Sequence, residues 1–314
     1  MVEAHPATCP LCASLGKPVL EQVQDYYFHC PGQWTILQCQ SGTCGVAWID
    51  PAPSEELLSL AYSTYYTHEE PADSPLKAQV KQLIVKLALA APQGLLSRRD
   101  LTGQLRLVED AFCNIGAMRP LPRGTILDVG AGNGNRLDVL LRAGWGKAIG
   151  VEIDSKAVEA ARAQGRQVDT GTADAIPLSD GSVDAAIMHH VIEHVPDPGE
   201  ALREIGRVLV RGTGRLAILT PNFNSLSRLK WAKFWRGVEA PRHLHIFTQA
   251  SLSRLLQANG FVIETGRCSA RSRAWTDAVS GEAAAKAGAP VPATVRAPTD
   301  EMGEELLYVA RYAG

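Results

Sequence analysis

The sequence predicts an α/β fold in which a mostly parallel sheet is covered by helices and preceded by a small cysteine-rich module. Three observations support this prediction. From residue 123 onward, short apolar runs alternate with amphipathic segments, the pattern of a parallel sheet covered on both faces. Glycines fall at every second position in "ILDVGAGNGN", directly after the first apolar run. Five of the seven cysteines lie within the first 44 residues.

Composition argues against several classes of function. The chain of 314 residues is 46% hydrophobic and 20% charged, which is ordinary for a globular protein. Its formal net charge of −2 gives no electrostatic basis for binding nucleic acid or an anionic membrane. No apolar run approaches the ~18 residues of a membrane span, and "MVEAHPATCPLC" lacks the layout of a signal peptide. We therefore expect a cytoplasmic protein with no nucleic-acid partner and no membrane span.

Two units are expected before the sheet. Residues 1–50 combine turn residues, aromatics and cysteines, and are expected to form a small module. Residues 51–120 are expected to form a helical linker or cap. Ser54 is a suitable N-cap for its first helix, and "LKAQVKQLIVKLALA" places its apolar residues on one helical stripe.

Residues 121–314 are expected to form the α/β domain. Strands are expected in "TILDVG", "KAIGVEI", "QVDTGTA", "VDAAIMHH", "GRLAILTP" and, last, "EELLYVARY". Between them, "NRLDVLLRAG" and "SKAVEAARAQG" are helices that end at glycines, and "DPGEALREIGRVLV" begins with an aspartate cap and a proline. Residues 222–248 are rich in aromatic and basic residues and are predicted to form a lid insertion. Residues 271–302 are rich in Ala, Pro and Gly and are predicted to form a flexible insertion.

The glycine loop indicates a ligand that lies on bare backbone. Gly130, Gly132 and Gly134 follow a strand and precede a helix, so that backbone N–H groups at the helix N-terminus are open to a ligand. The spacing differs from the dinucleotide pattern. Asp128 disfavours a pyrophosphate, because two anions would face each other, and suits a ligand with an ammonium group. A tight turn that binds no ligand is the alternative.

Further polar residues follow the next strands. Glu152 ends the second strand, where a carboxylate can accept both hydroxyls of a ribose. Asp174 follows the third strand and is placed to accept an adenine amino group. "HHVIEHVPDP" follows the fourth strand, at the carboxyl edge where open parallel sheets bind ligands. Each acid alone reads as a solvated loop residue, but their register along successive strand ends indicates a site.

Residues 123–268 resemble the class I S-adenosylmethionine-dependent methyltransferases. The resemblance lies in "ILDVGAGNGN", "GVEIDSKAVEAAR", "GTADAIPLSDGSVDAAIMHHVIEHVPDP" and "PRHLHIFTQASLSRLLQANGF". It implies a Rossmann-like, seven-stranded, mostly parallel sheet with an antiparallel last strand at about 304–312. It also implies S-adenosylmethionine as the cofactor, bound by Asp128, Gly130, Ala131, Gly132, Gly134, Glu152, Ile153, Asp174, Ala175 and His189.

Histidines are the candidates for catalysis. The cofactor carries its own activated methyl group, so the protein must align the acceptor and help remove a proton. His190 and His194 follow the fourth strand, and His243 and His245 lie in the 222–248 insertion. "PRHLHIF" resembles the family pattern Pro-x-His-x-x-x-Phe, which favours His243, with His194 and His190 as further candidates. Packing or hydrogen bonding to backbone stays open for each of them.

The cysteines predict a metal site. Cys9 and Cys12 have Cys-x-x-Cys spacing, and Cys39 and Cys44 form a looser second pair, within the range of tetrahedral zinc sites. The layout resembles the zinc-ribbon-like module found ahead of some methyltransferases. Structural Zn²⁺ is the expected ligand, with Cys30 as an alternative member of the set. Reduced cysteines without metal remain possible from the sequence alone.

The combined expectation is a methyltransferase that acts on a small molecule. A hydroxyl of a sugar or glycan precursor is the preferred acceptor, and a quinone or secondary-metabolite hydroxyl is the alternative. An S-adenosylmethionine-binding protein without transfer activity is a rival from another class. A nucleic-acid methyltransferase is disfavoured by the charge and by "TPNF", which lacks the expected Pro-Pro-aromatic motif. The acceptor and the oligomeric state stay open.

Overall fold

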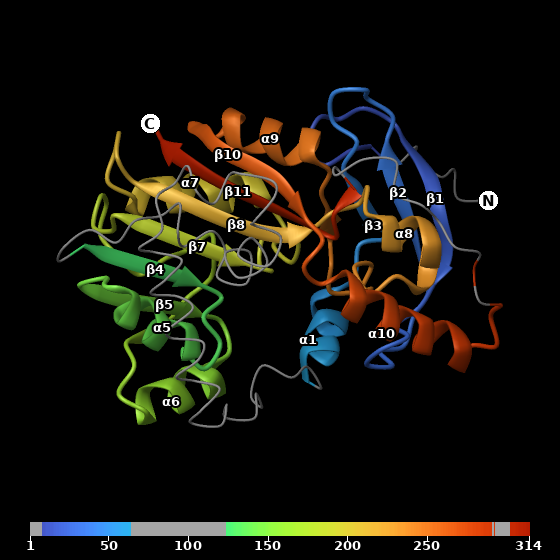
Figure 1. Cartoon of the computed structure of the whole chain (residues 1–314), viewed down its shortest axis with the longest axis horizontal. Coiled ribbons are helices and arrows are strands. Elements are labelled where there is room, and N and C mark those ends of the chain that lie inside the picture. Colours follow the sequence, from blue (N-terminus) through green and yellow to red (C-terminus); the bar gives the residue numbers. More distant parts are fainter. Residues whose placement is uncertain (1–7, 64–123, 291, 293–301) are drawn as a thin grey trace, which may run out of the picture.

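The computed structural model describes residues 8–63, 124–290, 292 and 302–314. The expected helices between 64 and 120 lie outside the described residues. The described residues contain two β-sheets, which lie toward opposite ends of the molecule (Figure 1). None of the helices in these ranges has the length and apolar character needed to cross a membrane.

The larger sheet has seven strands in the order β10-β11-β8-β7-β4-β5-β6. All its neighbours from β8 to β6 are parallel, and β11 runs antiparallel to both β8 and β10. This confirms the predicted fold class and the antiparallel last strand. The bounds are β4 (Thr125–Val129), β5 (Lys147–Glu152), β6 (Val168–Thr170), β7 (Ala185–His189), β8 (Arg215–Pro221), β10 (Phe261–Ser269) and β11 (Glu305–Tyr312).

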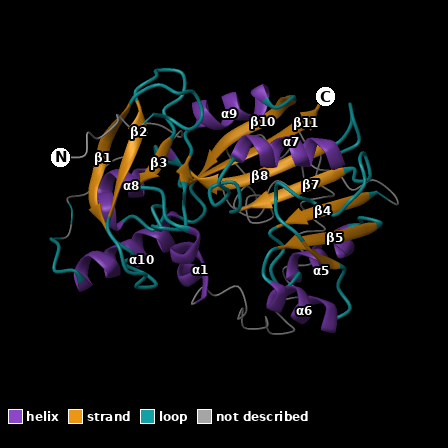
Figure 2. Ribbon diagram, turned by 180° about the vertical axis from the view of Figure 1, so that it is seen from behind, coloured by secondary structure: helices purple, strands orange, loops and turns teal. Residues whose placement is uncertain are grey.

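Helices cover both faces of this sheet (Figure 1 and Figure 2). On one face of the sheet, buried strand residues pack against α5 and α6. On the other face, the alternate strand residues pack against α7 and α9. Helix α7 begins as predicted, because the Asp197 side chain accepts from two backbone N–H groups and Pro198 follows it. The bounds are α5 (Asn135–Ala143), α6 (Ser155–Ala163), α7 (Pro198–Val208) and α9 (Gln249–Ala258).

The smaller sheet, which we call the ribbon sheet, has four strands in the order β1-β2-β3-β9. The first three come from the cysteine-rich module: β1 (Gly16–Val23), β2 (Trp34–Cys39) and β3 (Ala47–Asp50). The fourth, β9 (His245–Ile246), belongs to the 222–248 insertion and pairs antiparallel with β3. Helix α1 (Glu55–Ser63) follows β3, and Ser54 accepts a hydrogen bond from its first turn, as predicted.

The insertion at 222–248, expected to be a lid, packs against the ribbon sheet. It contains α8 (Leu226–Trp231) and the 3₁₀ helix η1 (Ala232–Phe234) before it reaches β9. Trp231 and Trp235 are buried in a core shared with the ribbon sheet. Its aromatic residues therefore join the two sheets, because the ribbon sheet offers them an apolar face that no local sequence pattern reveals.

The predicted flexible insertion at 271–302 is corrected in its first half, which forms helix α10 (Arg273–Lys286). Alanine is the strongest helix former, and Ala283 and Ala284 are buried on the inner side of this helix. Asp277 fixes the helix to α8, where it accepts hydrogen bonds from Ser227 and Trp231. Of the second half, residues 291 and 293–301 lie outside the described residues.

Candidate active site

The glycine loop after β4 is tied to the neighbouring strand. The backbone N–H groups of Gly130 and Ala131 both donate to the carbonyl of Val151, over 2.8 and 3.1 Å. Gly130 has a φ of +70°, and a Cβ there would lie 2.6 Å from a methyl group of Val191. Only glycine fits this position, because both the backbone conformation and the space exclude a side chain. The loop therefore lies directly against the segment that follows β7.

Glu152, the last residue of β5, holds the same loop. Its two carboxylate oxygens accept from the backbone N–H groups of Gly132, at 2.8 Å, and Asp154, at 3.0 Å. The side chain is buried, and each oxygen keeps a second lone pair. The expected ribose-binding residue thus also shapes the glycine loop, a role that the sequence did not indicate.

Asp128 is buried beside a cation that sequence reasoning missed. Burial raises the pKa of its carboxyl to about 6, although Arg136 acts in the opposite direction. The Nε atom of Arg136 lies 3.4 Å from a carboxylate oxygen of Asp128. Arg136 is in the first turn of α5, so its position directly after the glycine loop was the available signal. A carboxylate and a guanidinium at one point suit a zwitterionic ligand.

The remaining predicted cofactor residues lie at the same edge of the sheet. Ile153, Asp174 and Ala175 are exposed, on the segments that follow β5 and β6. His189 ends β7, and its buried Nε2 atom has no hydrogen-bond partner among the described residues. Burial lowers the pKa of His189 well below its usual range, so the ring is neutral.

His190 is held between two carboxylates. Its Nδ1 lies 3.0 Å from Glu193 and its Nε2 lies 3.4 Å from Glu305. Burial alone would lower the pKa of His190, but these hydrogen bonds outweigh it and raise the pKa to about 9. A ring that is already protonated at neutral pH cannot accept a proton, so this geometry suits electrostatic stabilisation better than general base catalysis.

His243 and His194 form a close pair, with ring centroids 4.7 Å apart. The Nδ1 of His243 donates to the carbonyl of Gly237 over 2.8 Å, and its Nε2 lies 3.5 Å from Glu239. Burial lowers the pKa of His243 to about 4, although Glu239 acts in the opposite direction. The Nδ1 of His194 lies 3.1 Å from the carbonyl of Arg242. Glu239 was missed by the sequence analysis, although its position four residues before His243 offered a signal.

His190, His194 and His243 line one cleft of about 430 Å³. The cleft lies between the carboxyl edge of the large sheet, the insertion and α10. The Oε2 atoms of Glu304 and Glu305 are buried and have no hydrogen-bond partner among the described residues. His245 is not among the lining residues and bonds to the carbonyl of Pro196. The lining residues are His190, His194, Pro221, Trp235, Arg236, Gly237, Glu239, His243, Ser272, Trp275, Thr276, Glu304 and Glu305.

Residues 98–265 match the model of a protein family described as "Methyltransferase domain". The chain belongs to this methyltransferase family. The match spans more than half of the chain and includes the glycine loop, Glu152 and the segment after β7. The α/β part of the protein is thus a class I S-adenosylmethionine-dependent methyltransferase domain, as the sequence predicted.

Relatives of this methyltransferase match it over part of their length. A probable S-adenosylmethionine-dependent methyltransferase of Mycobacterium tuberculosis is 37% identical over 149 residues, 46% of this chain and 52% of that protein. The malonyl-(acyl-carrier protein) O-methyltransferase of Methylococcus capsulatus is 32% identical over 165 residues, 50% of this chain and 58% of that protein. The chain thus spans little more than half the length of these two relatives. A crystal structure of a possible histamine N-methyltransferase from Thermotoga maritima has a TM-score of 0.46 at 24% identity, covering 75% of this chain and 94% of that one.

The ribbon sheet is joined to the methyltransferase domain through Arg242. This fully buried side chain donates to Asp25 of the cysteine-rich module at 2.7 Å and to Glu239 of the insertion at 3.3 Å. It also donates to the carbonyl of Ala61, in α1, at 3.0 Å. Arg242 directly precedes His243, so these bonds fix the backbone that carries the histidine.

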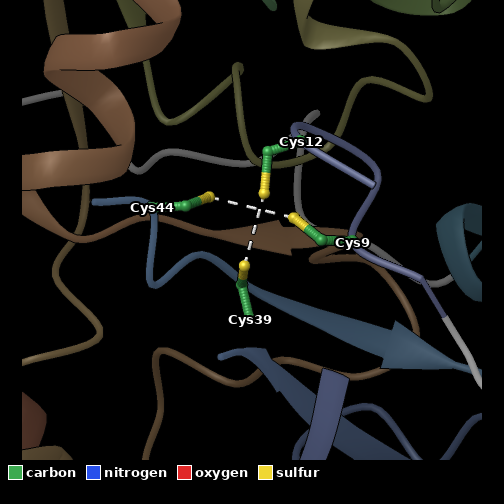
Figure 3. A group of neighbouring side chains, drawn as sticks. All are labelled: Cys9, Cys12, Cys39 and Cys44. Carbon is green, nitrogen blue, oxygen red and sulfur yellow. Dashed lines mark hydrogen bonds between the residues drawn. The ribbon is translucent and has the colours of Figure 1, made fainter. Parts of the chain in front are cut away.

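Four cysteines of the module meet at one point (Figure 3). The Sγ atoms of Cys9 and Cys44 are 3.8 Å apart, those of Cys12 and Cys39 are 3.5 Å apart, and all four lie within 4.8 Å of one another. Four thiolates about 2.3 Å from one tetrahedral zinc ion would be separated by about 3.8 Å, so this donor set fits the metal. Cys30 lies apart, with its thiol directed at the carbonyl of Pro31.

Proposed function

We propose that this protein transfers the methyl group of S-adenosylmethionine to a small molecule bound in the cleft. One observation carries the proposal: the glycine loop and the cleft meet at the end of β7. Gly130 packs against Val191, while the preceding residue, His190, lines the cleft. A cofactor on the loop and an acceptor in the cleft would therefore be neighbours, as direct transfer requires.

The cofactor-binding residues are assigned by their chemistry. Asp128 would pair with the ammonium group of the methionine part, and Arg136 with its carboxylate. Glu152 would accept the ribose hydroxyls through the lone pairs left after its backbone bonds. Asp174 and Ala175 would face the adenine, with Ile153 beside it. The buried, unpaired Nε2 of His189 would lie near the sulfonium group.

The acceptor is proposed to be rich in hydroxyl groups, as a sugar or glycan precursor is. Glu304 and Glu305 line the cleft, and carboxylates accept hydrogen bonds from hydroxyl groups. Trp275 lines the same cleft with 57% of its surface exposed, and offers an apolar face. A phenolic or quinone-type acceptor has fewer donors for these two carboxylates.

The cofactor supplies the activated methyl group when bound, and the side chains of the cleft act on the acceptor. We assign activation of the acceptor hydroxyl to His194 and His243, the adjacent pair that lines the cleft. His190, held as a cation by Glu193 and Glu305, would stabilise negative charge that develops on the acceptor oxygen.

We also propose that Cys9, Cys12, Cys39 and Cys44 bind a structural zinc ion, and that the protein is cytoplasmic. None of the six described cysteines is in a disulfide, which supports a reducing compartment. The zinc would stabilise the ribbon sheet and take no part in methyl transfer.

Calorimetric titration with S-adenosylmethionine, followed by transfer assays with tritium-labelled cofactor, tests the function. Pools of nucleotide sugars, free sugars and phenols serve as acceptors. We expect cofactor binding in the micromolar range and labelling of a sugar pool, with loss of labelling in Glu305→Gln. Binding without labelling of any pool would favour a binding protein, and labelling of phenols alone would overturn the sugar assignment.

A further inference from the structure

Glu193, His194 and His243 form a second group of metal-ligand residues, apart from the cysteine cluster. One ligand atom of each lies within 4.8 Å of the other two. Glu193 and His194 follow β7, and His243 comes from the insertion, so the group assembles only in the folded protein. Two imidazoles and one carboxylate are a ligand set typical of first-row divalent transition ions.

Hydrogen bonds at Nδ1 orient both histidine rings. The Nδ1 of His243 faces the carbonyl of Gly237, and the Nδ1 of His194 faces the carbonyl of Arg242. A carbonyl can only accept, so the Nδ1 of His243 carries the proton and its Nε2 is left with a lone pair. The Nδ1 of His194 also lies 3.0 Å from the hydroxyl of Tyr62, so both of these partners are on Nδ1 and its Nε2 is the nitrogen that faces the group. A histidine that donates its other N–H to a backbone carbonyl is the usual arrangement of a metal ligand.

A cation would also relieve an unfavourable contact. The Nε2 of His243 faces a carboxylate oxygen of Glu239 at 3.5 Å, which brings two acceptors together. A divalent cation on this nitrogen would make the contact with Glu239 attractive.

The carboxylate of Glu193 is held in place for such a role. It is fully buried, with one oxygen bonded to His190 and the other accepting from the hydroxyl of Thr220 at 3.0 Å. Each oxygen keeps a lone pair for a further partner.

We propose that Glu193, His194 and His243 bind a divalent transition-metal ion that positions an oxygen of the acceptor in the cleft. The role of the ion rests on the proposed methyl transfer: with the ion bound, His194 and His243 would act on the acceptor hydroxyl through the ion and not as bases. His194 and His243 line the cleft, so a ligand position of the ion would face the acceptor. Ligand nitrogens about 2.1 Å from one tetrahedral ion lie about 3.4 Å apart, so binding would draw ligand atoms that now lie within 4.8 Å of one another together by at most about 1.4 Å.

Cobalt titration of the full-length protein tests the site, because Co²⁺ reports its ligands in the visible spectrum. Bound by nitrogen and oxygen, Co²⁺ gives weak d–d bands, whereas the cysteine cluster adds an intense thiolate charge-transfer band. With the cysteine cluster filled by zinc, we expect one further equivalent of Co²⁺ without the charge-transfer band. Glu193→Gln and His194→Gln are each expected to weaken this binding at least tenfold. His194 is only half-buried, so its variant is the safer one for folding.

His29→Asn is the matched control, because His29 is an exposed histidine of the ribbon module and lies outside the group. Its cobalt binding should equal that of the unchanged protein. No second equivalent of Co²⁺ in the unchanged protein would overturn the proposal, as would unaltered binding in both variants. Titration of the same samples with S-adenosylmethionine separates the two claims. Cofactor binding without cobalt binding refutes the metal site alone, whereas absent cofactor binding refutes the proposed function.

Discussion

The guanidinium of Arg242 and the carboxylate of Asp25 form a 2.7 Å ion pair in which neither side chain is exposed. Asp25 belongs to the ribbon module, and Arg242 precedes His243 in the cleft. The carboxylate of Asp25 also accepts from the backbone N–H groups of Tyr27, Phe28 and Cys30. One buried carboxylate therefore organises a turn of the module and the approach to the active-site histidines.

Removal of this carboxylate should strongly destabilise the protein. Asp25→Ala removes the shorter of the two carboxylate contacts of a buried guanidinium, and breaking a buried ion pair typically costs about 3–5 kcal/mol. Urea unfolding followed by circular dichroism measures the loss. Glu264→Gln is the control, because Glu264 pairs with Arg215 in a partly exposed contact that is worth at most ~1 kcal/mol. Equal losses in the two variants would contradict a special role for the buried pair.

Affinity for S-adenosylmethionine should depend on pH through Asp128. Its pKa of about 6, raised by burial, means that the carboxylate which attracts the ammonium group is lost as the pH falls below 6. We expect the Kd to rise by up to about tenfold per pH unit below that point. In the cofactor-free protein, the raised pKa of Asp128 makes folding more favourable at low pH, because the folded protein binds the proton more tightly than the unfolded chain does. This contribution to the free energy of unfolding is complete below about pH 4 and is lost as the pH rises through about 6.

Calorimetric titrations at several pH values test this dependence. Asp128→Asn should bind weakly at every pH and show a flat profile, while Asp180→Asn, at an exposed site, should behave like the unchanged protein. A flat profile in the unchanged protein would show that Asp128 does not bind the ammonium group.

The cofactor site could be predicted because its signals are local. A glycine loop after an apolar strand, and acids at the ends of the next strands, keep their spacing whatever surrounds them. Arg242 could not be read in this way, since its partner Asp25 lies 217 positions away. Helix α10 was missed for the same reason, because its buried side contacts α8 and the insertion, and the nearby prolines suggested a loop.

The cysteine cluster should carry one equivalent of zinc. Cys9→Ser removes a ligand, so the purified variant should lose the metal and unfold at a lower temperature, since a structural zinc site contributes directly to folding. Elemental analysis together with a thermal scan measures both effects. Cys30→Ser should keep its zinc, because Cys30 is a buried cysteine outside the cluster. Zinc-free unchanged protein would refute the assignment.

Asp277 should affect binding of the acceptor and leave binding of the cofactor unchanged. Asp277→Ala removes the acceptor of the Trp231 N–H group, at 2.8 Å, and should cost about 1–3 kcal/mol. The same change loosens α10, whose residues Trp275 and Thr276 line the cleft, so the KM for the acceptor should rise while the Kd for S-adenosylmethionine stays constant.

Glu282→Ala on the same helix provides the matched control. Glu282 is exposed and, among the residues that the structure describes, its ion pair is with Lys286, so its loss should change neither the unfolding midpoint nor the KM. A rise in the cofactor Kd of Asp277→Ala would mean that α10 also supports the glycine loop.

The contribution of β9 to the ribbon sheet also bears on synthesis of the chain. Strand β3 ends at Asp50, but the strand that covers its edge begins at His245, roughly 195 residues later. Ribosomes add about 5–20 residues per second, so this edge stays open for roughly ten to forty seconds on every nascent chain. An uncovered strand edge invites pairing with other chains, which makes this interval the point at which newly made protein is most exposed to aggregation.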